Sequence, residues 1–225
     1  MANRPVYHSL NVPPFYEKCD NQFEFNPGFS VSQKQRNIRA LHESYLQQYP
    51  DRHILEVSSK SEEKLGVLLS AFNLQFFRNN KLYTVESAFQ GSKVFENGVQ
   101  YTDLYHATSS AAKKDTRLIE SGKVVCFQFG DDMFPNEPKT FFYNWLYINA
   151  LVNNDELTSQ IMRYDSFSDI EFNEKKSINC QAMAAAIYVG LVKSTLLEKA
   201  LLSKENFLRI VYEQEKKYEQ ISLFD

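Results

Sequence analysis

The sequence predicts an α+β fold that is mainly α-helical and contains a few short β-strands. Several long segments repeat apolar residues every three or four positions, which is the spacing of a helix with one buried face. Between them lie short segments rich in Phe, Tyr and Val, bounded by Asn, Asp or Gly, which is typical of strands. A chain of 225 residues suits one sizeable domain, or one domain with an N-terminal extension.

The chain begins with extended segments and continues into a helix. Residues 1–30 mix Pro, Asn and aromatic residues, so short extended pieces and turns are expected there. A helix is expected from Val31 to just before Pro50, because Ser30 can cap its first turn and apolar residues recur at helical spacing. Residues 53–58 are expected to form a short strand.

A hairpin and a second helix are expected next. The pair Asn79-Asn80 favours the turn of a hairpin over residues 74–85. A helix over residues 85–95 should follow, with Thr84 as its N-cap. A further strand is expected over residues 124–129.

The C-terminal half is expected to be helical. Pro138 begins an aromatic helix that reaches about Leu151, and a short helix follows over residues 155–164. Residues 178–202 are apolar on nearly every side, which indicates a central buried helix. Ser203 should cap a last helix, whose apolar stripe consists of Phe207, Leu208, Val211, Tyr212 and Tyr218.

The composition excludes several classes of protein. Lys and Arg number 25 and Asp and Glu number 28, so the formal net charge is −3. This balance argues against a generally basic protein that coats nucleic acid, but it allows a local basic patch. The seven glycines form neither a dinucleotide-binding G-x-G-x-x-G motif nor a phosphate-binding P-loop, and no G-x-S-x-G nucleophile elbow is present.

No metal site and no membrane segment are expected. The four histidines form no H-E-x-x-H motif, and Cys19, Cys126 and Cys180 are too far apart for a C-x-x-C motif. Three sparse thiols fit a reducing compartment. The N-terminus has no apolar signal core, and residues 182–192, the longest apolar run, are too few to cross a membrane, so a cytoplasmic location is expected.

Glu86, Gln90 and Lys93 form a polar face on the otherwise apolar helix expected over residues 85–95. At about 100° per residue they lie at i, i+4 and i+7, within one narrow arc. This face is either a solvated stripe on a half-buried helix or a partly buried site. In a buried site, desolvation would lower the pKa of the lysine, and its neutral amine could attack an electrophilic carbon.

A second candidate region extends from Tyr164 to Gln181. Acidic residues are followed there by Lys175, Lys176 and Ser177, just before the expected buried helix. A helix N-terminus beside lysines can bind an anion, so a phosphate or pyrophosphate would fit. Alternatively, the segment is a surface loop in which Ser177 caps the helix.

Basic and aromatic residues elsewhere offer weaker signals. The segments 33–39 and 109–117 are basic and could contact phosphates, but they equally fit solvated helix faces. Most Phe and Tyr residues are expected in the core. Four aromatic residues could instead stack on a base: Phe72, Tyr83, Trp145 and Tyr164.

Two segments together carry a recognisable motif. Residues 69–73 read L-S-A-F-N, and residues 83–95 read Y-T-V-E-S-A-F-Q-G-S-K-V-F. They resemble the signature of the NADAR (YbiA-like) family, and the resemblance covers about residues 65–200, through Lys113, Arg117, Asp169 and Asn179. Residues 142–147 and 177–182 resemble the subgroup encoded beside DarT-type DNA ADP-ribosyltransferase toxins.

This resemblance implies a YbiA-like helical domain over residues 61–225, on which residues 1–60 pack as an N-terminal extension. It implies a hydrolase of N-glycosidic bonds that removes ADP-ribose from the amino group of guanine in DNA and acts as an antitoxin. No cofactor and no metal are implied. The expected partners are ADP-ribosylated guanine in DNA and the cognate ADP-ribosyltransferase toxin, and no membrane is implied.

The residue chemistry allows two mechanisms for this reaction. In the first, Lys93 forms a transient Schiff base with C1 of the distal ribose, and Glu86 or Asp169 transfers protons. In the second, Glu86 or Asp169 activates a water molecule for direct attack, and Lys93 only positions the substrate. A nearby carboxylate raises the pKa of a lysine and so opposes the first mechanism.

The remaining candidate residues are expected to bind substrate. They are Ser70, Phe72, Asn73, Tyr83, Gln90, Lys113, Arg117, Trp145, Lys175, Lys176, Ser177 and Asn179. Two other functions stay open at this point: a module that binds ADP-ribose or the toxin without catalysis, and an N-glycosidase of a small ribosylated metabolite.

Overall fold

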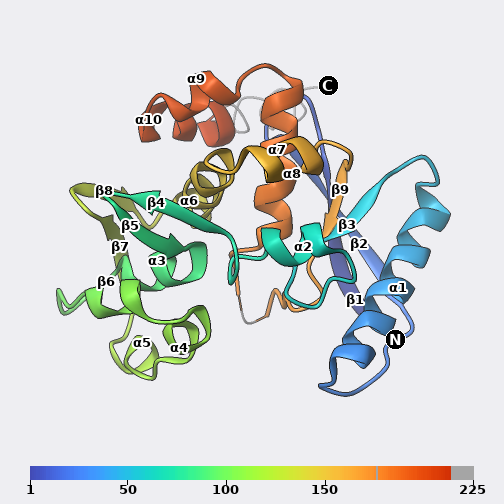
Figure 1. The fold of residues 1–225 in the computed structure, drawn as a ribbon, viewed down its shortest axis with the longest axis horizontal. Coiled ribbons are helices and arrows are strands. Elements are labelled where there is room, and N and C mark those ends of the chain that lie inside the picture. Colours follow the sequence, from blue (N-terminus) through green and yellow to red (C-terminus); the bar gives the residue numbers. More distant parts are fainter. Residues whose placement is uncertain (176, 214–225) are drawn as a thin grey trace, which may run out of the picture.

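A computed structural model describes residues 1–175 and 177–213, and it confirms the predicted α+β fold. Helix α8 (Gln181–Lys193) occupies the centre of the molecule (Figure 1). An N-terminal sheet with helix α1 (Val31–Gln48) lies on one side of α8, and a smaller sheet with helix α3 (Val85–Gly91) lies on the other.

The remaining elements are short. The strands are β1 (Ala2–Ser9), β2 (Tyr16–Phe23), β3 (Ile54–Glu56), β4 (Gln75–Arg78), β5 (Lys81–Thr84), β6 (Lys93–Phe95), β7 (Val124–Phe129), β8 (Asp132–Pro135) and β9 (Ser166–Ser168). The other helices are α2 (Lys64–Leu69), η1 (Thr102–His106), α4 (Ser109–Lys114), α5 (Arg117–Glu120), α6 (Phe141–Val152), α7 (Asp155–Ile161), α9 (Leu197–Leu201), α10 (Lys204–Leu208) and η2 (Arg209–Glu213).

The N-terminal sheet has the strand order β2-β1-β9-β3. Strand β1 is antiparallel to both β2 and β9, whereas β3 is parallel to β9, with Glu56 opposite Ser168. The extended pieces predicted over residues 1–30 are thus β1 and β2. Strand β9 was not predicted, because its three residues carry too little alternation to be recognised in the sequence.

Helix α1 covers one face of this sheet, as its apolar spacing predicted. Ser30 caps the helix by accepting a hydrogen bond from the backbone N–H of Gln33, at 3.2 Å from N to Oγ. The helix buries Ile38, Leu41 and Tyr45 against β1 and β2. These contacts form a separate small core, so the sheet is covered by α1 on this side.

Helix α8 is buried on all sides from Gln181 to Leu191, as its apolar composition predicted. The helix was predicted over residues 178–202, but it begins at Gln181 and ends at Lys193. The chain turns at Thr195, whose φ of 58° is left-handed, before α9 starts at Leu197. The main core forms where α6, β1 and β9 pack against α8.

Helix α10 begins after Ser203, whose hydroxyl accepts a hydrogen bond from the backbone N–H of Asn206. This confirms the predicted cap. The predicted apolar stripe included Tyr218, which lies outside the described residues. Within residues 1–175 and 177–213, no helix combines the length and the apolar character needed to cross a bilayer.

Gly190 lets the β1–β2 connection pack directly on α8. A Cβ atom at this position would lie 2.4 Å from the carbonyl oxygen of Leu10 and 2.7 Å from that of Phe15. These two backbone segments are themselves joined by a hydrogen bond of 3.0 Å from Leu10 N to Phe15 O, so neither carbonyl can move aside without cost.

Gly190→Ala is therefore expected to lower the free energy of unfolding by about 1–3 kcal/mol, because the added methyl group overpacks a rigid contact. Urea denaturation followed by circular dichroism measures the change. Lys193→Ala, at the exposed C-terminal end of the same helix, is the control and should shift stability by less than about 0.5 kcal/mol. Equal stability of the two variants would contradict the packing described for α8.

Candidate functional site

The candidate site forms where three segments distant in sequence meet around Ala71. The carbonyl of Ala71 accepts a hydrogen bond of 2.9 Å from the backbone N–H of Glu86, in the first turn of α3. The N–H of Ala71 donates to the side-chain Oε1 of Gln181, the first residue of α8, at 2.7 Å. One peptide segment therefore holds the starts of α3 and α8 beside each other.

Glu86 and Gln90 are both buried on α3, with 4% and 7% of their surfaces exposed. Gln90 Nε2 donates to Glu86 Oε1 at 2.8 Å, whereas Gln90 Oε1 is buried without a hydrogen-bond partner. A buried amide oxygen without a partner is unfavourable unless something else supplies a donor. The helix is fixed at its start by a reciprocal capping box between Thr84 and Ser87.

Lys93 lies on a strand, which corrects the prediction of one helix over residues 85–95. Helix α3 ends at Gly91, and the hydroxyl of Ser92 donates to the carbonyl of Ala88 at 2.7 Å. Strand β6 then starts at Lys93, which pairs with Phe127 of β7. Sheet pairing with a segment 34 positions away thus ends the helix, and the helical spacing of Lys93 from Glu86 does not apply.

Lys93 nevertheless lies near the buried acid. Burial lowers the pKa of the Lys93 amine, the charge of Glu86 opposes this shift, and the charge of Lys113 adds to it. The Lys93 Nζ lies 5.1 Å from the centre of the Phe89 ring, which covers the side chain. A lysine in these surroundings releases its proton more readily than a solvated one.

Asp169 approaches the same region from the N-terminal sheet. It directly follows β9 and is 7% exposed, and its carboxylate accepts hydrogen bonds from the backbone of Glu171 (3.0 Å) and from the side chain of Gln181. Burial raises the pKa of Asp169, the nearby charge of Glu56 raises it further, and the charge of Lys113 opposes the shift.

Glu56 is a second buried acid beside Asp169, at the end of the parallel strand β3. It accepts hydrogen bonds from the hydroxyl of Ser168 and from the backbone N–H of Ile170, the latter at 2.8 Å. Burial also raises the pKa of Glu56. On its other side, Glu56 lines a cavity of about 190 Å³ between α1, β3 and residues 61–63.

His42 connects this cavity to the sheet. Its Nε2 lies 2.8 Å from the hydroxyl of Ser168, which is bonded to Glu56. Burial lowers the pKa of His42 to about 4, so the imidazole is neutral at neutral pH. The sequence drew no attention to His42 or Glu56, since neither belongs to a motif.

Tyr143 is close enough to both acids of the site to be affected by their charges. Burial raises the pKa of its hydroxyl, and the charges of both Glu86 and Asp169 add to the shift. The ring packs edge-on against Phe89 on α3, with 5.2 Å between ring centres. Sequence reasoning assigned no role to Tyr143 or Gln181, although both lie in segments that carried the family resemblance, which was the available signal.

Phe72 and Lys113 form part of the rim of this site. The Lys113 Nζ lies 5.0 Å from the centre of the Phe72 ring, and its charge acts on both Lys93 and Asp169. The hydroxyl of Ser109 donates to the carbonyl of Phe72 at 2.8 Å, which ties helix α4 to this segment. Of the predicted substrate-binding residues, Gln90 is thus bonded to Glu86 itself, and the charge of Lys113, which lies over Phe72, acts on both Lys93 and Asp169.

Neighbouring predicted residues have structural contacts instead. Ser70 is buried and its hydroxyl accepts from the backbone N–H of Phe72 at 3.4 Å, while the exposed Asn73 donates to the carbonyl of Val67. Tyr83 packs among Phe76, Tyr105 and Phe129, with ring centres 5.8–6.0 Å apart.

Two predicted residues are engaged away from the acids. Arg117 pairs with Asp103 and Asp115, with 2.7 Å from Nη2 to each carboxylate, and its guanidinium lies over the Tyr101 ring. Trp145 packs against Phe134, with 4.8 Å between the rings.

The loop before α8 presents both exposed and buried groups. Lys175 and Ser177 are exposed, and the N-cap of α8 is Cys180, so Ser177 is not the cap. Asn179 Oδ1 is buried and has no hydrogen-bond partner. Lys176 lies outside the described residues.

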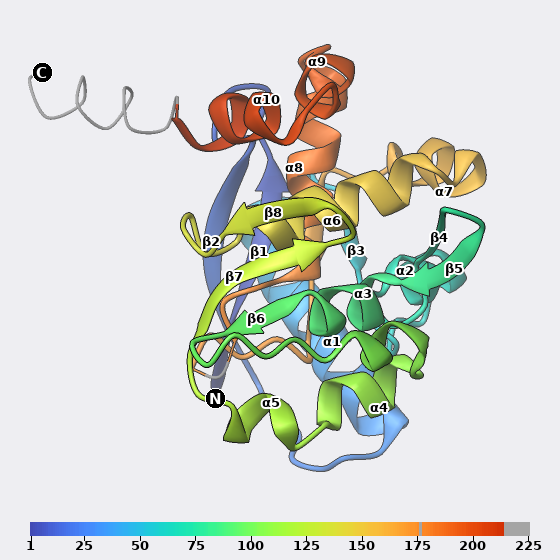
Figure 2. The same ribbon diagram turned by 90° about the vertical axis from the view of Figure 1, so that its left-hand side faces the viewer.

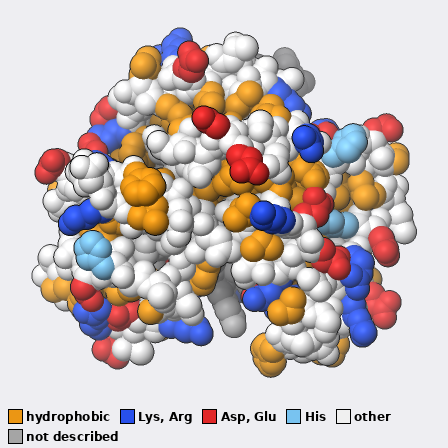
Figure 3. All heavy atoms as spheres, viewed as in Figure 1, with side chains coloured by type: hydrophobic (Ala, Val, Ile, Leu, Met, Phe, Trp, Pro, Cys, Tyr) orange, Lys and Arg blue, Asp and Glu red, His pale blue; other side chains and the backbone are white. Residues whose placement is uncertain are grey.

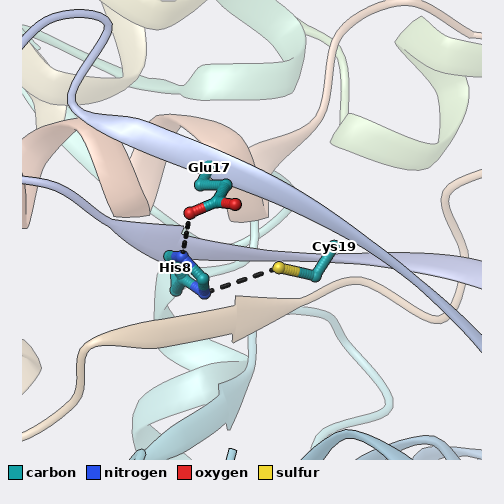
Figure 4. Close-up of side chains that lie close together, drawn as sticks. All are labelled: His8, Glu17 and Cys19. Carbon is teal, nitrogen blue, oxygen red and sulfur yellow. Dashed lines mark hydrogen bonds and ion pairs between the residues drawn. The ribbon is translucent and has the colours of Figure 1, made fainter. Parts of the chain in front are cut away.

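A separate polar cluster on the N-terminal sheet consists of His8, Glu17 and Cys19 (Figure 4). Glu17 contacts His8 Nε2 at 2.8 Å, whereas Cys19 lies 3.5 Å from His8 Nδ1. Because the two partners approach different ring nitrogens, one metal ion could not bind all three residues as they stand. Tyr45 also bonds His8 Nδ1, so the cluster joins β1 and β2 to α1.

Comparison with known proteins assigns the chain to a family. The model of the DarT1-associated NADAR antitoxins matches residues 2–221, nearly the whole chain. The matched region includes the N-terminal sheet and every segment of the candidate site. No curated protein matches the chain.

The raised pKa of Asp169 predicts a specific dependence of stability on pH. The folded protein holds this proton to a higher pH than the unfolded chain, whose Asp titrates near 3.8. Above that pH the unfolded chain binds fewer protons, so stability falls as the pH rises until the folded carboxyl also ionises. Asp169→Asn removes this contribution, so its stability relative to the wild type should rise between pH 5 and pH 8.

Urea denaturation of both proteins at several pH values measures this difference. Asp51→Asn, at an exposed position, is the control and should show no such trend. A constant difference between Asp169→Asn and the wild type across this pH range would show that Asp169 is not held protonated by the fold.

Proposed function

Because the chain belongs to the DarT1-associated NADAR antitoxin family, we propose that it is an N-glycosidase that removes ADP-ribose from the amino group of guanine in DNA. It would thereby remove the modification that a DNA ADP-ribosyltransferase toxin adds to DNA. The observation that carries this proposal is a largely desolvated lysine, Lys93, near the buried acid Glu86. A second buried acid, Asp169, is joined to the backbone of Glu86 through Gln181 and Ala71.

Lys93 is proposed as the nucleophile. A lysine attacks carbon only as the neutral amine, and burial of Lys93 lowers its pKa in the required direction. The positive charge of Lys113 lowers it further. The negative charge of Glu86 raises the pKa of Lys93. Burial and the positive charge of Lys113 must therefore together outweigh the effect of this one carboxylate.

Asp169 is proposed as the acid. Its raised pKa keeps a proton available where an ordinary aspartate would be ionised. Glu86 is proposed to transfer protons between the attacking and leaving nitrogens. The unpaired Oε1 of Gln90 and Oδ1 of Asn179 are acceptors suited to hydroxyl or amino groups of the substrate.

The first half of the reaction exchanges one nitrogen for another at C1 of the distal ribose. Asp169 gives its proton to the ring oxygen, the ring opens, and an iminium forms between C1 and the guanine nitrogen. The Lys93 amine adds to C1, and Glu86 moves a proton from the lysine nitrogen to the guanine nitrogen. The bond from C1 to guanine then breaks, which leaves a Schiff base on Lys93 and unmodified guanine.

The second half is hydrolysis of the Schiff base. Water adds to C1 and gives a proton to a carboxylate of the site. Collapse of the resulting carbinolamine releases the Lys93 amine and the open-chain aldehyde of ADP-ribose, which recloses. The sum is consumption of one water, with free ADP-ribose and guanine as products. The rival mechanism, direct attack by water, needs no bond to Lys93.

Trapping distinguishes these mechanisms. With guanine-ADP-ribosylated oligonucleotide and sodium cyanoborohydride, the wild type should gain a stable adduct of the mass of reduced ADP-ribose on Lys93, located by mass spectrometry. Lys93→Ala should form no adduct, and Lys199→Ala, at an exposed position on α9, should form it normally. Turnover without any adduct would favour direct attack by water, and a stable complex without turnover would favour a binding module.

The two acids should have separate, measurable effects on rate. Glu86→Gln and Asp169→Asn are each expected to lower kcat by about 10²–10⁴-fold, the usual contribution of a positioned acid or base. Glu96→Gln, at an exposed position just after β6, is the control. The wild-type kcat should fall as the pH rises through the raised pKa of Asp169, because the acid is then lost. If kcat instead stays constant as the pH rises into the alkaline range, Asp169 is not the acid of the reaction.

A further inference from the structure

The β4–β5 hairpin presents an exposed hydrophobic pair to solvent. Phe77 of β4 lies directly opposite Leu82 of β5, and they are 69% and 47% exposed. The other face of the hairpin carries Phe76 and Tyr83, which pack against Phe129 in the core. In the space-filling view, hydrophobic side chains reach the surface over this hairpin (Figure 3).

The hairpin is held in a defined position. Asn79 and Asn80 both have positive φ, 51° and 58°, as the tight two-residue turn of a regular hairpin requires. Near the tip, the Arg78 guanidinium pairs with Asp132 at 2.9 Å and lies 4.3 Å from the centre of the Phe129 ring. Phe77 and Leu82 are therefore displayed on an anchored support.

Both ends of the hairpin lead directly into the candidate site. Strand β4 begins two residues after Asn73, close to Phe72 at the rim, and β5 ends at Thr84, which caps the helix that carries Glu86. Figure 2 shows the hairpin extending outward from the start of α3. If a substrate is larger than the site, the part that extends past the rim would contact this hairpin.

The chemistry around the pair favours a nucleic acid over a protein. Lys81 is exposed beside Leu82, and Lys113 and Lys114 are exposed on α4, whose Ser109 is bonded to Phe72 at the rim. Two exposed side chains are far less than the roughly 800 Å² that each partner buries in a stable protein interface. An exposed aromatic ring with an exposed lysine close by, as Phe77 has in Lys81, is instead suited to stacking on a base beside a charged backbone.

We propose that the β4–β5 hairpin binds the DNA next to the modified guanine, with Phe77 stacking on a neighbouring base and Lys81 contacting a backbone phosphate. This inference rests on the proposed function and identifies how the chain would bind its polymeric substrate. An enzyme that acts on a base must take it out of the stack, which leaves the neighbouring base without a partner. An apolar side chain can occupy that position.

The test compares substrates with and without flanking DNA. The substrates are ADP-ribosylated guanosine nucleoside, a single-stranded oligonucleotide with one modified guanine, and the same oligonucleotide in a duplex. The double variant Phe77→Ser/Leu82→Ser should lower kcat/KM on both oligonucleotides by about 5- to 100-fold, the range for loss of one stacked base. Its kcat/KM on the nucleoside should stay within about twofold of the wild type.

Leu202→Ser, which removes an exposed side chain (77%) next to α9, is the matched control and should leave all three rates unchanged. A loss restricted to the duplex would mean that Phe77 acts where a base leaves a double helix, and a loss on both forms would mean stacking on a single strand. Equal losses on nucleoside and oligonucleotide, or no loss at all, would overturn the proposal.

Binding provides a readout that does not need turnover. Fluorescence anisotropy of a labelled oligonucleotide should show weaker binding by the double variant than by the wild type. This result is expected even if the wild type has no activity. Failure of this inference can therefore be told apart from failure of the proposed function. Lys81→Glu should reduce the slope of log affinity against log salt by roughly 0.7–0.9, the value for one phosphate contact. Lys199→Glu, exposed on α9, should leave the slope unchanged.

Discussion

The site depends on the two hydrogen bonds of Ala71. Its carbonyl holds the backbone of Glu86, and its N–H holds the side chain of Gln181. Gln181 in turn donates to Asp169, so an acid from a helix and an acid from a sheet belong to one bonded unit. Since every link is buried, water cannot readily replace a broken bond, and the unit should keep its geometry until substrate enters.

Burial also decides the charge states in the site. Buried charges are costly, so burial favours a protonated Asp169 and a neutral Lys93, and each shift is in the direction that removes a charge. A proton on the acid and a free electron pair on the amine are what the proposed formation of a Schiff base would require. Desolvation is the largest cause of both shifts, and one neighbouring charge adds to each: Lys113 for Lys93 and Glu56 for Asp169.

The N-terminal segment contributes to this arrangement from a distance. Strands β1 and β3 pair on either side of β9, and Asp169 directly follows β9. Parallel pairing puts the ends of β3 and β9 together, which brings Glu56 beside Asp169, and the charge of Glu56 adds to the burial that raises the pKa of Asp169. The first 60 residues thus affect the protonation of an acid more than 100 positions later, and the family match from residue 2 includes them.

The sequence by itself determined the elements whose signals are local: α1 with its Ser30 cap, the hairpin with its Asn79-Asn80 turn, and the buried character of α8. It also proposed Glu86 and Lys93 as site residues, on a helical spacing that the structure does not have, because α3 ends at Gly91 and Lys93 lies on β6. Only the tertiary structure decided that α3 ends at Gly91 and that Asp169 lies beside Glu56 and Gln181. The reason is physical: strand pairing and desolvation depend on residues far away in the chain, whereas caps and turns depend on their immediate neighbours.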